Sequence, residues 1–492
     1  MLQYTDSQVD RYMYELCMYL DSEHTQQLRS RLSGCLNVSD RTSAFMDFLC
    51  VLGSICFRYT TYYSLPSVRR GGGSSLVDGM YVFGGEVWER VDGVKLKIAL
   101  KDFCIGKLGM STQEWLRNGD KYMLSLRDGS MLSPLEVSKR VVGFGNGVYD
   151  FTDINNIVYH PFADRLPVIE LLGYDYSLSA TCPLWRSFLS TILDKNQVSI
   201  LQKFFALGLF DRASMEHKVE NTLWLVGPGG VGKSTILDTI TAVYGRSNVS
   251  SASLNDLLSV NSVTRPLVMG TIAGKVFNFC GEAQVSTMTG AKADGFKSLC
   301  SGEAQPVRMI GKDYELRSDI PFMVFSMNKK PRLGTIDNAI TRRILFVTFK
   351  TMIREADRDA ELGHKLLGEL SGIRNWLLEG YRMLIEDDFR FENSKGGVEE
   401  TDSWMAENGQ TLGLFLRKYD CRPYAYANSE ESSHWYPVKI LYDRYETFCN
   451  KWGYELDTEL AGMGRELRRL GYTSKRTASG MSYQIYGGEK LV

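Results

Sequence analysis

The chain has 492 residues, of which 44% are hydrophobic and 23% charged, proportions typical of globular domains with sizeable cores. The length predicts roughly three domains. The formal net charge of −1 argues against wholesale coating of nucleic acid, but it is compatible with local basic surfaces. Ten cysteines without a C-x-x-C pair and five scattered histidines argue against structural zinc and favour reduced thiols. The sequence shows no signal peptide and no apolar run of about 18 residues, so we expect a cytoplasmic protein without a membrane span.

The first part of the chain is expected to form an α+β domain over residues 1–140, whose role the sequence does not indicate. Residues 4–63 carry Leu, Met, Tyr and Cys at helical spacing, and the glycine-rich residues 69–75 predict a flexible break. From residue 79 to residue 100 apolar and polar residues alternate, which predicts a hairpin that turns at Asp92-Gly93.

A helical collar is expected next, over residues 141–215. Asn146-Gly147 predicts a turn before residues 148–150. Residues 185–210 are strongly helical in pattern. One face of that helical stretch is apolar and consists of Trp185, Phe188, Leu189 and Ile192.

The most informative segment covers residues 222–235. Residues 222–226 predict a short buried strand, and the residues after it fill every position of the G-x-x-x-x-G-K-[ST] phosphate loop. Glycines let backbone N–H groups face phosphate oxygens, Lys233 can reach the β- and γ-phosphates, and the Ser234 hydroxyl can ligate Mg²⁺. A chance glycine loop is the alternative, but the apolar helical pattern that follows argues against it. The segment predicts binding of ATP and Mg²⁺ through Gly227, Gly229, Gly230, Gly232, Lys233, Ser234 and Thr235.

Two later strands are expected to complete this site, because residues 221–349 alternate between strand and helix patterns as in a parallel α/β sheet. Residues 275–282 predict a hydrophobic strand that ends in Glu282, whose carboxylate can orient the attacking water beside Mg²⁺. Residues 321–328 predict a strand that ends in Asn328, whose amide can bond the γ-phosphate or the water. An exposed strand-end glutamate and a simple turn after Asn328 are the respective alternatives.

Paired arginines precede the last predicted strand of the sheet, residues 344–349. Arg342 or Arg343 can act as an arginine finger on the nucleotide of a neighbouring subunit, or both can belong to a solvated edge. The series of phosphate loop, Glu282, Asn328 and arginine pair resembles a superfamily 3 helicase. It is most similar to the C-terminal half of the phage/plasmid and poxvirus primase–helicase family.

Further segments extend this resemblance over about residues 140–490, most strongly over residues 221–349. Residues 297–303 match the family pattern Lys-x-x-x-(Ser/Thr)-Gly. The chain departs from many P-loop ATPases at Gly281, where a second carboxylate is common. The resemblance therefore leaves open how Glu282 divides its work with Ser234 in holding Mg²⁺.

A hairpin is predicted between the Glu282 and Asn328 strands. Residues 307–310 and 314–317 flank Gly311-Lys312-Asp313, which forms its tip. The resemblance implies that this hairpin lies in the channel of a ring, where Lys312 grips a DNA phosphate and Arg308 lies near the base. A solvated surface hairpin is the alternative.

The last part of the chain predicts helices, a linker and a small DNA-binding unit. Residues 355–392 are helical in pattern, with Leu366, Leu370, Trp376, Leu377 and Tyr381 as core candidates, and residues 393–397 predict a linker. Two helical stripes of core residues follow, namely Leu441, Tyr445, Phe448 and Trp452, then Leu460, Met463, Leu467 and Leu470. A hairpin around Ser479-Gly480 completes a winged-helix pattern. Its predicted contacts with duplex DNA, for which a solvated charged face is the alternative, are Arg465, Arg468, Arg469, Lys475 and Arg476.

The patterns predict a multidomain α/β protein with a P-loop and a C-terminal winged helix, and the resemblance implies that the P-loop core is an AAA+-like ATPase preceded by a helical collar. The core is expected over residues 216–355, a helical segment and linker over 356–400, and the winged helix over 401–492. The resemblance implies an ATP-driven ring helicase, most simply a hexamer, that acts on single-stranded and forked DNA for a phage, virus or plasmid-like element, with a separate primase or polymerase. The alternatives are a regulatory or origin-recognition ATPase switch and the helicase half of a primase–helicase. A small-molecule kinase fits poorly because it explains neither the arginine pair nor the basic C-terminal residues.

Overall fold

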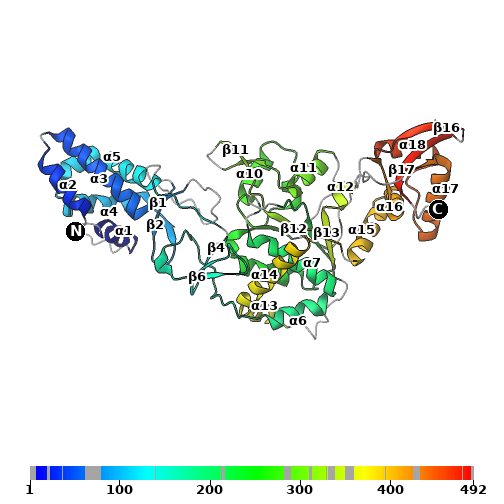
Figure 1. Ribbon diagram of the computed structural model, residues 1–492, viewed down its shortest axis with the longest axis horizontal. Helices are drawn as coiled ribbons and strands as arrows, with labels where there is room; N and C mark the ends of the chain where they lie inside the picture. The colour runs from blue at the N-terminus through cyan, green and yellow to red at the C-terminus, as the bar shows by residue number, and fades with distance from the viewer. Residues whose placement is uncertain are drawn as a thin grey trace.

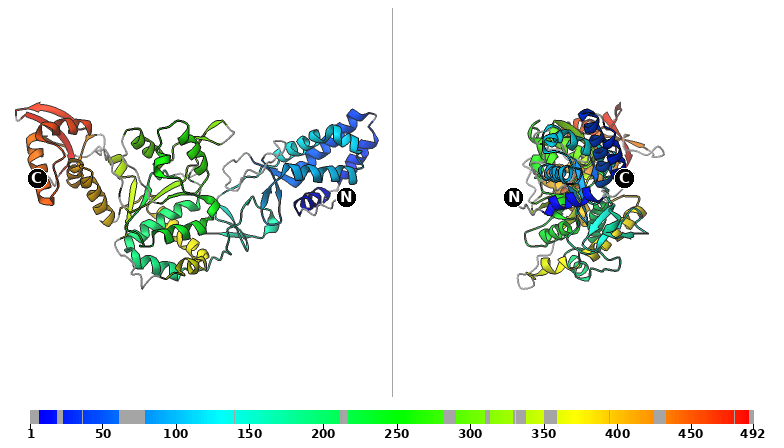
Figure 2. Two further views of the ribbon diagram at one scale, coloured as in Figure 1. Left: turned by 180° about the vertical axis from the view of Figure 1, so that it is seen from behind. Right: turned by 90° about the vertical axis from the view of Figure 1, so that its left-hand side faces the viewer.

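The computed structural model of the chain is elongated, with three units along its long axis (Figure 1). A helical unit lies at the N-terminal end, an α/β unit lies in the middle, and a smaller α/β unit lies at the other end, as the rear view in Figure 2 also shows. The structure describes residues 7–18, 23–35, 37–60, 79–138, 140–210, 212, 217–281, 290–309, 313–328, 330, 338–349, 359–393, 395–424, 433–478 and 480–488. Within these ranges, none of the helices combines the length and apolar character needed to cross a membrane.

Over its described residues, the N-terminal unit combines five helices with a small sheet. It consists of α1 Ser7–Cys17, α2 Glu23–Ser33, α3 Val38–Cys56, β1 Phe57–Tyr59, β2 Met80–Phe83, β3 Trp88–Arg90, α4 Gly93–Gly106 and α5 Thr112–Met131. Within residues 4–63, predicted to be helical, the described residues form α1, α2 and α3 before the short strand β1. The strands form an antiparallel sheet in the order β1-β2-β3. Helices α3 and α5 approach so closely at Gly53 that a Cβ atom there would lie 2.0 Å from the carbonyl oxygen of Leu126. The flexible break predicted at residues 69–75 lies outside the described residues.

The hairpin predicted at Asp92-Gly93 is wrong in its position. Strands β2 and β3 do form a hairpin, but residues 84–87 connect them. Asp92 instead caps α4, since its Oδ1 accepts hydrogen bonds from the backbone N–H groups of Val94 at 2.9 Å and Lys95 at 3.0 Å. The residues after Gly93 are helical because their buried side chains recur at helical spacing, namely Leu96, Ala99, Leu100 and Phe103.

A small antiparallel sheet and two helices lead into the central unit. These elements are β4 Val141–Phe144, β5 Gly147–Asp150, β6 Val158–His160, α6 Pro183–Ile192 and α7 Lys195–Ala206. The predicted turn is present, with Gly147 at a φ of 141°. The stretch predicted as helical is divided into two helices, because Asp194 caps α7 by accepting from the Gln197 N–H at 2.9 Å. The predicted apolar face is buried.

The central unit contains a five-stranded parallel sheet in the order β13-β7-β12-β9-β8. Its elements are β7 Thr222–Val226, α8 Lys233–Tyr244, β8 Val249–Ser250, α9 Leu254–Leu257, α10 Thr264–Ile272, β9 Phe277–Cys280, α11 Ala291–Cys300, β10 Gln305–Arg308, β11 Tyr314–Arg317, β12 Phe322–Met327, α12 Asn338–Thr341, β13 Ile344–Thr348, α13 Leu362–Leu367 and α14 Leu370–Glu386. The predicted parallel α/β sheet is confirmed. Because all five strands run the same way, the residues that follow them meet at one edge.

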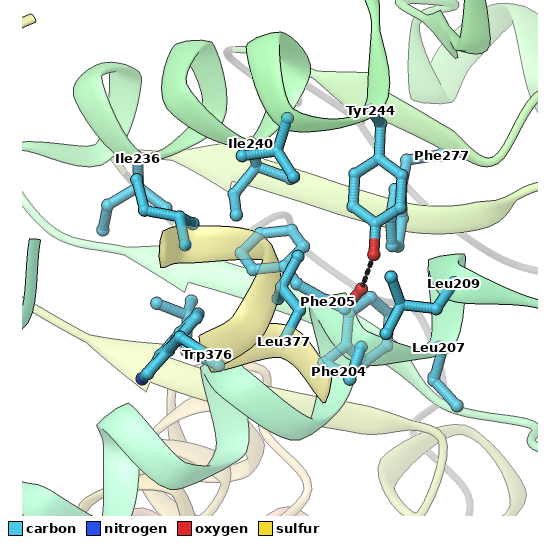
Figure 3. Close-up of a cluster of buried hydrophobic side chains, with 14 of the residues drawn as sticks. Phe204, Phe205, Leu207, Leu209, Ile236, Ile240, Tyr244, Phe277, Trp376 and Leu377 are labelled. Carbon is cyan, nitrogen blue, oxygen red and sulfur yellow. Dashed lines mark hydrogen bonds between the residues drawn. The ribbon is translucent and has the colours of Figure 1, made fainter. Parts of the chain in front are cut away.

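Both faces of the sheet are covered, as expected for a parallel sheet. Along β7, Leu223 and Leu225 belong to one buried cluster, whereas Trp224 and Val226 belong to the other. Figure 3 shows part of the first cluster, where side chains of α7, α8 and α14 meet and the Tyr244 hydroxyl donates to the Phe205 carbonyl at 2.6 Å. The predicted core residues of α13 and α14 are buried there, with Tyr381 partly buried against the cluster.

The second cluster continues into the C-terminal unit. That unit consists of α15 Lys395–Glu407, α16 Thr411–Lys418, β14 Cys421–Arg422, β15 Ser433–Pro437, α17 Val438–Trp452, α18 Leu460–Arg469, β16 Ser474–Thr477 and β17 Gly480–Gly487. The linker predicted at residues 393–397 is wrong, because α15 begins at Lys395 and packs on β13. The Asn393 side chain covers the edge of β13, accepting from the Phe346 N–H at 3.2 Å and donating to the Ile344 carbonyl at 3.0 Å.

The core stripes of the C-terminal unit are buried except at three positions, of which Leu470 is half-buried against the second core cluster. Trp452 is 53% exposed and Leu460 is 41% exposed, so the prediction that both are core residues is wrong. Trp452 is the last residue of α17 and Leu460 is the first residue of α18. Each of these two side chains therefore lies at a helix end, where neighbouring elements cover it only in part.

Candidate functional site

The glycine-rich loop lies between the carboxyl end of β7 and the amino end of α8. Its backbone requires glycine at Gly230 and Gly232, whose φ angles are 76° and 93°. A Cβ atom on Gly232 would also lie 2.9 Å from the Phe188 ring of α6. The loop thus packs on α6. The first turn of α8, which follows the loop, has free backbone N–H groups, as every helix N-terminus does.

Lys233 is the first residue of α8, and its side chain returns over the loop. The Nζ atom donates to the carbonyl oxygens of Gly227 and of Pro228, the latter at 2.9 Å, and to Oδ1 of Asn328 at 3.1 Å. Burial lowers the pKa of Lys233, which is only 8% exposed. Among the described residues, no carboxylate forms an ion pair with this ammonium group. A buried cation held only by neutral oxygens fits the negative charge of a triphosphate.

Asn328 reaches Lys233 because β12 is the parallel neighbour of β7. Met327 pairs with Val226, and the Gly227 N–H donates to the Met327 carbonyl at 3.2 Å. The structure therefore brings together the predicted loop lysine and the predicted strand-end amide, which are 95 residues apart in the sequence. Strand β9 lies on the other side of β12, but Glu282 is outside the described residues, so its role stays a prediction.

The two arginines before β13 have different surroundings. The Arg343 side chain is 9% exposed, its Nη2 atom lies 2.8 Å from Oε2 of Glu220, and its backbone carbonyl accepts from the Thr222 N–H at 2.7 Å. The Arg342 side chain is 59% exposed and lies 3.6 Å from the same glutamate oxygen. Arg343 is thus part of the packed sheet edge, whereas Arg342 is accessible from outside.

Glu220, the partner of both arginines at the amino edge of the sheet, is a residue that the sequence reasoning missed. Burial raises the pKa of its carboxyl group, but Arg343 and hydrogen bonds from Lys218 and Ser301 outweigh burial, and the net pKa is lowered. The only sequence signal is an acidic residue just before a buried strand, which by itself predicts no partner. Its arginine partners follow more than 120 residues later, and only the β13–β7 pairing brings them together.

The predicted hairpin is confirmed over its described residues. Strands β10 and β11 pair antiparallel, with Arg308 opposite Tyr314, and the Arg308 guanidinium lies 5.1 Å from the centre of the Tyr314 ring. Tyr314 and Leu316 are 52% and 74% exposed, whereas Val307 is buried in the second core cluster, so the hairpin is exposed along β11 and packs on the core along β10. Lys312, the predicted DNA contact at the tip, lies outside the described residues.

The predicted basic residues of the C-terminal unit lie on α18 and β16 and are exposed: Arg465, Arg468, Arg469, Lys475 and Arg476. Two of them have partners within the unit. The Arg469 guanidinium is paired with Glu466, and Nζ of Lys475 lies 3.9 Å from the ring centre of Trp435. Trp435 was not among the predicted site residues, because a single aromatic residue in a short strand gives no distinctive pattern.

Two family descriptions match parts of the chain. Residues 121–194 match "D5 N terminal like", and residues 225–343 match "Family of unknown function (DUF5906)". These matches support a relationship with phage and viral primase–helicase-like replication proteins, the group that the motif series resembles.

Solved structures of the NrS-1 C-terminal region are similar to this chain over much of its length. The A form apo structure is 10% identical, covers 71% of this chain and 96% of its own, and has a TM-score of 0.37. The apo structure of region 305–718 is 11% identical, covers the same shares and has a TM-score of 0.34.

Proposed function

We propose that the chain is an ATP-hydrolysing DNA helicase that works as a closed ring of identical subunits, six in number, in the replication of a phage, virus or plasmid-like element. The observation that carries the proposal is the Lys233 ammonium group, which is buried at the carboxyl edge of a parallel sheet and held by neutral oxygens. A triphosphate seated on the loop would supply the counter-charge that this group lacks among the described residues.

The residues at this edge divide the chemistry of phosphate transfer among them. Loop N–H groups and Lys233 would bind the β- and γ-phosphates, and Asn328 would orient the γ-phosphate or the attacking water. Ser234, with Glu282 as predicted from the sequence, would hold Mg²⁺, which neutralises phosphate charge. Nothing in this arrangement requires a further protein nucleophile.

The position of Arg342 supports action on a neighbouring subunit. Strand β13 has five residues, so its first and last Cα atoms are about 13 Å apart. Arg342 precedes the amino end of β13, whereas the loop follows the carboxyl end of the parallel strand β7. Because Arg342 cannot reach the loop of its own chain, the proposal requires it to complete the nucleotide site of the adjacent copy.

The C-terminal unit supports DNA as the partner. From α16 on its elements follow in the order α16-β14-β15-α17-α18-β16-β17, which is the order of a winged helix with the short strand β14 added. The exposed arginines lie on α18, where a recognition helix would be. The exposed arginines of α18 suit phosphate contacts on a duplex. We place the single strand on the β10–β11 hairpin, where a non-specific grip suits translocation, and the fork duplex on α18.

The test is the substitution Lys233→Ala, with Lys365→Ala as a matched control on exposed helix α13. We expect Lys233→Ala to abolish DNA-stimulated ATP hydrolysis and strand separation on forked DNA, and to leave the fold intact by circular dichroism. The control is expected to behave like wild type. Unchanged ATP turnover in Lys233→Ala would overturn the site. Slow hydrolysis with sequence-specific duplex binding and no strand separation would instead establish the regulatory switch.

A further inference from the structure

The sheet of the C-terminal unit has two chemically different faces. Side chains alternate along β17, so Tyr483 and Ile485 point to one face, and Gln484 and Tyr486 point to the other. Tyr483 and Ile485 are buried in the second core cluster, and the Tyr483 hydroxyl donates to the Gly464 carbonyl of α18 at 2.9 Å. The first face is therefore the one that packs on α18, and the second, which we call the outer face, points away from it.

Strand register shows which residues share the outer face, because directly opposite residues in an antiparallel pair point the same way. Trp435 of β15 is opposite Gln484, and Arg422 of β14 is opposite Tyr486. Lys475 of β16 is opposite Ser482, which shares the outer face with Gln484. The outer face thus carries Arg422, Trp435, Lys475 and Tyr486. The Arg422 guanidinium is paired with Asp420 at 3.2 Å, so a phosphate has to share it with or take it from that carboxylate, and the ring of Tyr424 lies 5.8 Å from that of Tyr486.

The aromatic residues of the outer face are not needed to build the core. Tyr436, the neighbour of Trp435, packs against the second core cluster, whereas Trp435 and Tyr486 belong to none of the hydrophobic clusters of the described residues. Tyr424 is 71% exposed. The Lys475 ammonium covers the half-buried Trp435 ring, with Nζ 3.9 Å from the ring centre, a cation–π arrangement.

We propose that the outer face binds single-stranded nucleic acid, with bases stacked on Trp435 and Tyr486 and phosphates held by Lys475 and Arg422. Trp435 and Tyr486 are diagonal neighbours, about 7–8 Å apart, a spacing that two bases of an extended strand can span. A base that stacks on Trp435 displaces Lys475, whose flexible side chain then carries its charge to the adjoining phosphate. Duplex DNA does not fit, because its base faces are already stacked on one another.

This site is distinct from the basic residues of α18, which lie on the other side of the sheet. It does not depend on the nucleotide site, so the inference goes beyond the proposed function. Together the two surfaces would suit a fork, with the duplex on α18 and an unpaired strand on the outer face. The unit would then read the junction without base-specific contacts.

The chain offers a matched aromatic residue for comparison. Trp452 is 53% exposed and has a lysine nearby, with Nζ of Lys418 at 5.7 Å from the ring centre. Its surroundings are acidic, since it lines a cleft of about 840 Å³ together with Glu407, Glu455 and other carboxylates. Because the carboxylates of this cleft repel phosphate, we do not expect nucleic acid to bind there. Replacing Trp452 therefore removes an exposed tryptophan while leaving the proposed site intact.

The test measures binding of the full chain, without nucleotide, to a labelled oligothymidylate of about 12 nucleotides by fluorescence anisotropy. Stacking on one aromatic side chain is worth about 1–3 kcal/mol, so Trp435→Leu is expected to weaken single-strand binding roughly tenfold. Duplex binding and ATP hydrolysis are expected to be unchanged. Trp435→Phe should retain most of the affinity but lose the tryptophan quenching that the oligonucleotide causes, and Trp452→Leu should behave like wild type.

Equal single-strand affinity in wild type and Trp435→Leu would overturn the inference. So would an equal loss of duplex and single-strand binding, which would indicate that the substitution disturbs the whole unit. The proposed function is tested separately, because Lys233→Ala leaves the outer face unchanged. If that variant hydrolyses ATP normally while Trp435→Leu still weakens single-strand binding, the nucleotide site is refuted and the outer face stands.

Discussion

Replacing each arginine before β13 by alanine is predicted to separate a structural role from a catalytic one. Arg343→Ala removes the partner of Glu220 at 2.8 Å, and breaking a buried ion pair costs about 3–5 kcal/mol. Glu220 is 28% exposed and keeps Lys218 at 3.3 Å, so we expect the lower end, about 3 kcal/mol. Arg342→Ala removes an exposed pair at 3.6 Å, which is worth about 0–1 kcal/mol.

The effects on ATP hydrolysis are expected to run the other way. An arginine finger contributes on the order of 10³-fold or more to the rate, so Arg342→Ala should reduce hydrolysis by that factor while the melting temperature stays near wild type. Thermal unfolding and steady-state hydrolysis, measured on the same preparations, give both quantities. Arg343→Ala should show a lower melting temperature.

Mixing two inactive variants tests whether the finger acts between copies. Rings are formed from equal amounts of the two variants. An interface in such a ring is complete when an Arg342→Ala subunit, which keeps Lys233, supplies the loop and a Lys233→Ala subunit, which keeps Arg342, supplies the arginine. Random assembly makes roughly a quarter of the interfaces complete, so hydrolysis should recover to about that share of wild type. A mixture that co-assembles without recovery, or full activity of Arg342→Ala alone, would refute the reasoning.

Three further predictions follow from the same site and its surroundings. Asn328→Asp places a carboxylate where an amide oxygen now lies 3.1 Å from Lys233. The new charge should raise the pKa of Lys233 and compete with phosphate, so we expect ATP affinity to fall roughly tenfold in a nucleotide-binding titration. Unchanged affinity would contradict the assignment. Burial raises the pKa of Glu220, but Arg343 and hydrogen bonds lower it overall, so the stability that its charged form contributes is present above the ordinary pKa of 4.5 and is lost as the pH falls from there through the lowered pKa. Glu220→Gln should make the free energy of unfolding less dependent on pH in that acid range, and an unaltered acid dependence would argue against the pair. Lys312→Ala should leave basal hydrolysis intact and weaken strand separation on forked DNA, whereas wild-type unwinding would show that the hairpin is not the DNA grip.

The sequence was most informative where a local pattern has a single physical meaning. The loop before Lys233 and the hairpin of β10 and β11 were predictable because their geometry depends on nearby glycines and alternating side chains. The segment after Asp92 was mistaken for a strand because Val94, Leu96 and Ile98 also fit a period of two. There the capping side chain of Asp92 decides for the helix.

Contacts between distant segments were beyond reach of the sequence. Glu220 meets its arginine only because β13 pairs with β7, an order that no local pattern specifies. The exposure of Trp452 likewise depends on where α17 ends relative to its neighbours, since its spacing from Phe448 is that of a core residue. The outer face of the C-terminal sheet emerged only from strand register, because Trp435 and Tyr486 are far apart in sequence.

The opposite placement of the loop and Arg342 has a consequence for assembly. A two-fold dimer uses the same patch on both copies, whereas a contact between the loop edge of one copy and the arginine edge of another uses two different patches. However many copies join by such a head-to-tail contact, the row keeps one unused loop edge and one unused arginine edge at its two ends until it closes on itself. Under the proposed function, a closed ring is therefore the simplest assembly in which every proposed nucleotide site would be complete, and it would enclose an axis along which a DNA strand can pass. The same geometry predicts that a mutant unable to close would hydrolyse ATP more slowly without any change at Lys233.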